Sequence, residues 1–85
     1  MAEVNSKIEV RPLYEIASEI KQNWVSWRKS YAEPYINAMS DLSSINDNYM
    51  FDSAKSIVLY FLANAQSWRG EAARRIKAEL KAMVA

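Results

Sequence analysis

Cysteine and histidine are both absent from the 85 residues of this chain. Their absence excludes disulfides, thiolate catalysis, histidine-based acid–base chemistry and the structural zinc sites that these residues build. The chain also contains only one glycine and two prolines. A β-rich domain of this size needs several tight turns, most of which use glycine or the pairs Asn-Gly and Asp-Gly. Neither pair occurs, so the composition favours an all-α fold.

Long apolar stretches are missing as well. The longest uninterrupted run, residues 57–63, is far shorter than the roughly 20 residues of a membrane-spanning helix. No basic segment followed by an apolar stretch opens the chain, so we expect no signal peptide and no membrane association. Hydrophobic residues make up 51% and charged residues 25% of the chain, which is the balance of a folded globular domain.

The first part of the chain predicts a long amphipathic helix behind a flexible lead-in, residues 1–10. The helix starts at Pro12, because proline fits the first helical position, and it runs for about 18 residues. Its apolar residues recur at steps of three and four along one stripe: Leu13, Ile16, Ala17, Ile20, Trp24, Trp27 and Tyr31. This stripe predicts that Trp24 and Trp27 lie in the core.

A second, shorter helix is predicted from about Pro34 to about Ser43, because proline disfavours helical geometry in the residue before it. Its apolar face comprises Tyr35, Ile36, Met39 and Leu42. The polar segment 44–52 then predicts a turn, since Asn and Asp side chains bond to nearby backbone. Asp52 is expected to act as the N-cap of a third helix.

The third helix is apolar nearly all round, which is typical of a helix with neighbours on several sides. Its end has two interpretations. Either residues 64–66 turn and Ser67 caps a fourth helix, or the third helix continues until Gly70 ends it. We favour the first, because an apolar stripe with a step of four passes through Gly70: Trp68, Ala72, Ile76, Leu80 and Val84. The chain is therefore predicted to be all-α, a compact bundle of three to four short helices in a single domain, residues 11–85.

Charge is distributed unevenly along the chain. Between residues 30 and 54 there are four acidic residues and no lysine or arginine: Glu33, Asp41, Asp47 and Asp52. This pattern indicates a surface that meets a basic partner, with the charge steering the encounter. The alternative is a set of capping and turn carboxylates that are close together only in sequence.

The C-terminal segment has the opposite charge. Its basic residues are Arg69, Arg74, Arg75, Lys77 and Lys81. They predict a strip that contacts the phosphates of DNA or RNA, or, alternatively, the solvated face of an amphipathic helix. Arg75 lies four residues from both Glu71 and Glu79, so local ion pairs with both are expected.

Two further features concern the 44–52 turn. Tyr49 and Phe51 would anchor a partner protein if exposed, whereas folding back onto the bundle is the alternative. Oxygen ligands for Mg²⁺ or Ca²⁺ are present, but their spacing is not that of an EF-hand, and turn formation explains the same residues: Asn46, Asp47, Asn48 and Asp52. Because turn formation accounts for these residues, we expect no metal. No motif pairs a nucleophile with a base, so we expect no catalysis, and we expect no cofactor.

Two stretches of the chain resemble known proteins. Residues 56–80, SIVLYFLANAQSWRGEAARRIKAEL, resemble the C-terminal half of small proteins of phages and other mobile genetic elements that have no assigned activity. Residues 11–17, RPLYEIA, are similar to the N-terminal segment of the same proteins. The resemblance implies a cytoplasmic location in a bacterial host. Small phage proteins of this kind often bind a host protein, and anti-CRISPR proteins, which share no common motif, are one such group.

Three hypotheses follow. The leading one is a non-enzymatic protein-binding module of a phage or mobile element, an inhibitor of a host defence nuclease that occludes a basic surface. The second is a small nucleic-acid-binding or regulatory protein that uses the basic C-terminal helix. The third is a structural or assembly protein that works as a homo-oligomer, and the sequence leaves the oligomeric state open.

Overall fold

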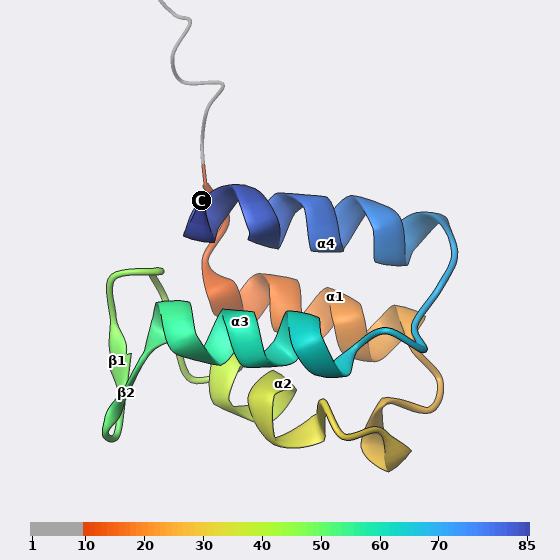
Figure 1. Cartoon of the computed structure of the whole chain (residues 1–85), viewed down its shortest axis with the longest axis horizontal. Coiled ribbons are helices and arrows are strands. Elements are labelled where there is room, and N and C mark those ends of the chain that lie inside the picture. The colour runs from red at the N-terminus through yellow and green to blue at the C-terminus, as the bar shows by residue number, and fades with distance from the viewer. Residues whose placement is uncertain (1–9) are drawn as a thin grey trace, which may run out of the picture.

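The computed structural model describes residues 10–85, so the predicted lead-in lies outside the described residues except for Val10, which is exposed. In the described part, four α-helices pack together beside one short antiparallel hairpin (Figure 1). The fold is therefore mostly α but not purely all-α. In chain order the elements are α1 (Leu13–Asn23), the 3-10 helix η2 (Trp27–Lys29), α2 (Glu33–Met39), β1 (Asn48–Tyr49), β2 (Asp52–Ser53), α3 (Ala54–Asn64) and α4 (Glu71–Val84).

The four α-helices form a closed arrangement around one apolar core. α2 contacts both α1 and α3, and α4 contacts the same two helices from the other side (Figure 1). The largest fully buried side chains come from all four: Leu13, Ile16, Ile20, Ile36, Met39, Val58, Phe61, Ile76 and Leu80. None of the helices within residues 10–85 has the length and apolar character needed to cross a membrane.

α1 is shorter than its apolar stripe predicts. It ends at Asn23, and the next residue, Trp24, adopts extended backbone (φ −121°, ψ 94°). The Trp24 ring stacks on Trp68, with ring centroids 5.4 Å apart and planes 7° from parallel. This long-range contact outweighs the local helical pattern. The two predicted core tryptophans are buried, but the prediction that Tyr31 continues the stripe is wrong, because its side chain is 87% exposed.

α2 also ends earlier than predicted. It begins at Glu33, with Pro34 in its first turn, and ends at Met39 rather than near Ser43. Leu42 is nevertheless buried in the core, as its place on the predicted apolar face requires. The chain reaches that position through a turn, in which the Leu42 N–H donates to the Met39 carbonyl at 3.0 Å.

The segment predicted as a turn contains a hairpin. β1 and β2 pair antiparallel, with Asn48 opposite Ser53 and Tyr49 opposite Asp52. Met50 and Phe51 connect them, and Met50 has a positive φ of 57°. Tight hairpin turns usually need glycine or asparagine, which is why the composition predicts no strands. That prediction is wrong here, because Met50 adopts the left-handed conformation in place of glycine or asparagine.

Ser53, and not Asp52, caps α3. The Ser53 hydroxyl accepts a hydrogen bond from the Ser56 N–H at 3.1 Å, whereas Asp52 belongs to β2. α3 contacts α2, α4 and β2, as expected for a helix with neighbours on several sides. Its buried residues nevertheless lie on one face, and Leu59 on the other face is 47% exposed.

The connection between α3 and α4 matches neither interpretation in full. α3 ends at Asn64, close to the predicted turn, but α4 begins only at Glu71, so Ser67 caps no helix. Gly70 is the N-cap of α4, with φ 110° and ψ −179°, a conformation that is open almost exclusively to glycine. Trp68 is buried as the stripe predicts, but it lies in the connection and not on a helix.

Candidate functional site

Two strongly exposed apolar side chains in the acidic segment form the hairpin tip, which we define as Met50 and Phe51. Phe51 is fully exposed and Met50 is 80% exposed. Tyr49, by contrast, is half-buried and packs against the core. Of the two aromatic residues predicted as anchors, the structure therefore presents Phe51 to solvent and folds Tyr49 back onto the bundle.

The four acidic residues have different environments. One Asp47 carboxylate oxygen accepts the backbone N–H groups of Ser43 and Ser44, each at 3.0 Å, so Asp47 holds the turn in shape. Glu33 is half-buried in the first turn of α2. Asp41 and Asp52 are exposed, and Asp52 directly follows the hairpin tip. Within residues 10–85, no group of three or more acidic side chains is close enough together to hold a metal ion.

Two of the five basic residues are engaged with the chain itself. Arg75 Nη2 lies 2.6 Å from Glu19 Oε2 on α1, so its predicted ion pairs with Glu71 and Glu79 are wrong. Glu19 of α1 takes the place of these two partners from α4. Glu79 binds Arg11 instead. Lys77 Nζ donates to the Trp68 carbonyl oxygen at 2.7 Å.

The remaining basic residues include two that share a cavity with Lys77. This α4 cavity has a volume of about 280 Å³ and is lined by Gln66, Trp68, Arg69, Gly70, Ala73, Arg74 and Lys77. Burial, followed by the nearby charges of Lys81 and Arg69, lowers the pKa of Lys77. Lys81 itself does not line the cavity. The structure therefore gathers three of the predicted cationic residues at one place: Arg69, Arg74 and Lys77.

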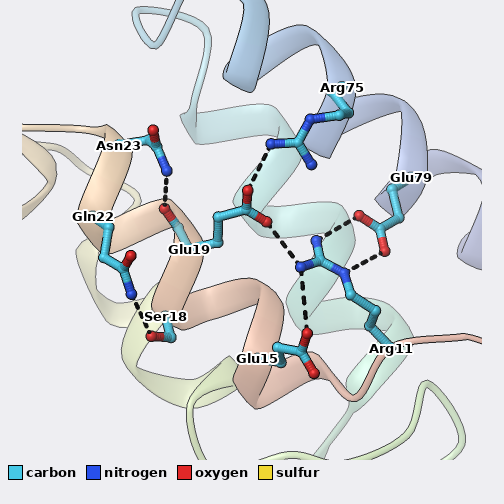
Figure 2. Close-up of polar contacts among 8 residues, drawn as sticks. All are labelled: Arg11, Glu15, Ser18, Glu19, Gln22, Asn23, Arg75 and Glu79. Atoms are coloured by element: carbon cyan, nitrogen blue, oxygen red, sulfur yellow. Dashed lines mark hydrogen bonds and ion pairs between the residues drawn. The ribbon is translucent and has the colours of Figure 1, made fainter.

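An ion-pair network that the sequence does not reveal connects the start of the described chain to α1 and α4. Arg11 donates two hydrogen bonds to Glu79, at 3.0 and 2.8 Å, and its Nη1 lies 2.8 Å from Glu19. Figure 2 shows Glu19 between Arg11 and Arg75, so one carboxylate bridges two arginines. The only sequence signal is the spacing of four between Arg11 and Glu15, whose 3.7 Å contact is the weakest of the set.

The ion-pair network makes the free energy of unfolding depend on pH in the acid range. The hydrogen bond from Arg75, and after it the Arg11 guanidinium 2.8 Å away, lower the pKa of Glu19 below its ordinary value of 4.5. The stabilisation is complete above pH 4.5, where Glu19 is ionised in the folded and the unfolded chain alike. As the pH falls from there through the lower folded-state pKa, the unfolded chain takes up the proton first. We therefore expect the free energy of unfolding, measured by urea titration, to decrease over this range.

A matched pair of variants isolates the contribution of Glu19. Glu19→Gln is expected to be less stable than the parent at neutral pH and to lose stability less steeply in acid. Glu71→Gln removes an exposed carboxylate that makes no ion pair with any residue in 10–85, and it should keep the parent profile. Parallel acid profiles for the parent and Glu19→Gln would contradict the assignment.

Comparison with known proteins adds no relative: no protein-family model, no curated protein and no solved structure matches this chain. The features of the described chain that bear on function are the hairpin tip, the acidic residues beside it and the α4 cavity.

Proposed function

We propose that this chain is a non-enzymatic protein-binding module whose hairpin tip enters an apolar pocket on a partner protein. The observation that carries this proposal is the conformation of the tip. Phe51 is fully exposed, and Met50, also exposed, has a positive φ of 57°. Both features cost free energy in the isolated chain, and neither contributes a contact to its core.

The cost has two parts. A non-glycine residue in a sparsely populated backbone conformation costs roughly 1–3 kcal/mol, and such strain is concentrated at functional sites. An exposed phenylalanine leaves its entire apolar surface in water. Burying that side chain in a partner's pocket would recover about 1.5–3 kcal/mol, the range typical of a dominant interface residue.

Charge indicates the chemistry around that pocket. Asp52 follows the tip directly, Asp41 is exposed as well, and no lysine or arginine occurs between residues 30 and 54. A partner with basic residues around an apolar pocket would be complementary to this surface. Such complementarity speeds the encounter and suppresses wrong partners more than it adds affinity.

The resemblance of residues 11–17 and 56–80 to phage and mobile-element proteins suggests which proteins to test first. A bacterial host protein with a basic surface, such as a defence nuclease, fits the proposed chemistry. Binding of the acidic hairpin region over that surface would exclude nucleic acid from it, so inhibition by occlusion is the corresponding mechanism.

Substitution of Phe51 tests the proposal. A chain with a photo-crosslinking residue at position 50 is used to identify the protein that the tip contacts in bacterial cells, and that protein is then purified. Phe51→Ser is expected to weaken its binding by about 30-fold or more, because loss of a dominant anchor costs at least about 2 kcal/mol. Binding is measured by calorimetry. Thermal unfolding should be unchanged, since Phe51 is outside the core.

Tyr31→Ser provides the matched control. Tyr31 is a second exposed aromatic, on the connection that leads into α2, and it should tolerate the change with less than a threefold loss of affinity. Equal losses for the two variants would contradict a specific role for the tip. Crosslinking of the tip to membrane lipid alone, together with binding of the parent chain to anionic lipid vesicles, would also overturn the proposal.

A further inference from the structure

We propose that the α4 cavity binds the phosphate group of a phosphomonoester. The cavity is lined by three cationic side chains, Arg69, Arg74 and Lys77, and none of its other lining residues is acidic. Its lining residues belong to the α3–α4 connection and the first part of α4. Figure 1 shows this connection at the end of the molecule opposite the hairpin. This site is therefore independent of the hairpin tip and of the proposed function.

The positive charge of the cavity is not neutralised by the described chain. Among residues 10–85, neither Arg69 nor Arg74 has a carboxylate within ion-pair distance. Lys77 uses one of its three N–H groups on the Trp68 carbonyl, which leaves two for a ligand. Burial lowers the pKa of Lys77, and the neighbouring charges of Lys81 and Arg69 lower it further, in keeping with the cationic lining of the cavity.

The wall of the cavity is held rigidly. Trp68 contributes to it, and this side chain is stacked on Trp24 at 5.4 Å and lies edge-on to Phe61 at 6.5 Å. Because the Trp68 carbonyl also fixes Lys77, the ammonium group is positioned before any ligand arrives. A site organised in advance loses less entropy when it binds.

Size and charge select the ligand class. The volume of about 280 Å³ is just below the range of about 300–1,000 Å³ typical of drug-sized ligands, so the cavity fits a small anionic group. Two arginines and a lysine suit a group with several acceptor oxygens, since guanidinium binds phosphate through paired hydrogen bonds. Three cations favour the nearly doubly charged phosphomonoester over the singly charged diester of a nucleic-acid backbone.

Amide NMR on ¹⁵N-labelled protein tests the site with four probes at constant ionic strength. They are inorganic phosphate, adenosine monophosphate, a short thymidine oligonucleotide with a 5′-phosphate, and the same oligonucleotide without it. We expect saturable shifts confined to residues 66–77, with a Kd in the roughly millimolar range or tighter. Binding of adenosine monophosphate would identify a free small molecule as the source of the group, and binding of the 5′-phosphorylated oligonucleotide would identify a strand end.

The variant Arg69→Gln/Arg74→Gln is expected to weaken phosphate binding by about tenfold or more, since charged hydrogen bonds to both arginines are lost. Lys29→Gln/Lys55→Gln removes the same charge from exposed positions elsewhere and should change the affinity less than twofold. Lys77 is left intact because it also bonds the backbone. Equal losses in both variants, shifts spread over all basic segments, or equal binding of the oligonucleotide without its 5′-phosphate would overturn the proposal.

Discussion

Replacement of Phe61 by alanine is expected to lower the free energy of unfolding by about 3–5 kcal/mol. Phe61 is the largest fully buried side chain of the domain and lies on the face of α3 that meets the core. Its ring also makes an edge-on contact with Trp68, which alanine cannot replace. Small domains have total stabilities of about 5–15 kcal/mol, so this single change would remove a large share of the total.

Urea titration followed by circular dichroism measures this effect. Leu59→Ala is the control on the same helix, because Leu59 is 47% exposed, and it should cost less than about 1 kcal/mol. If Phe61→Ala does not fold, Phe61→Leu, which preserves most of the volume, should fold with a loss of about 1–1.5 kcal/mol. A similar cost for Phe61→Ala and Leu59→Ala would contradict the packing described here.

Replacement of Trp68 by alanine is expected to have an effect of the same size, about 3–5 kcal/mol. Trp68 is buried although it lies in the connection between α3 and α4, and its ring stacks on Trp24 at 5.4 Å. The ring also lies edge-on to Phe61 at 6.5 Å and contributes to the wall of the α4 cavity. Loss of the ring should therefore loosen both the connection and this wall, although the backbone carbonyl that accepts the hydrogen bond from Lys77 remains in the alanine variant.

A double-mutant cycle separates the stacking from simple burial. Trp24→Ala and Trp68→Ala should be coupled by about 0.5–1.5 kcal/mol, since stacked rings contribute that much beyond their buried area. Trp27 is the matched control, because it is buried but faces Lys21 and Arg28, each 4.9 Å from its ring, instead of Trp68. Trp27→Ala and Trp68→Ala should be additive, and additivity in both pairs would contradict the stacked arrangement. Conservative leucine variants serve if the alanine variants do not fold.

Much of the core could be predicted from the sequence, but helix ends could not. The spacing of apolar residues correctly placed Trp24, Trp27, Leu42 and Trp68 inside, since burial is what maintains such a pattern. All four nevertheless lie outside the α-helices. The spacing of apolar residues indicates which side chains face the core, but not whether their backbone is helical. Trp24 is an example, because its stacking on Trp68 keeps its side chain in the core although its backbone is extended.

The candidate sites were predictable in residue type but not in arrangement. Exposure of Phe51 depends on a hairpin whose turn contains no glycine, so turn composition gave no signal. Two of the basic residues of α4 bind partners that are distant along the chain: Arg75 binds Glu19, and Lys77 binds the Trp68 carbonyl. The sequence alone therefore does not show which basic residues are engaged within the fold. The spacing of four residues predicts ion pairs between Arg75 and the glutamates of its own helix. In the folded chain Arg75 instead pairs with Glu19 of α1, at 2.6 Å.

The contact between Arg11 and Glu79, at 2.8 Å, has a consequence for how the domain could be joined to others. It places the point where the described chain enters the bundle beside the final turns of α4, so the start of the described chain and the end of α4 lie at the same edge of the bundle (Figure 1). A unit with adjoining ends can be spliced into a surface loop of a larger polypeptide without pulling its helices apart.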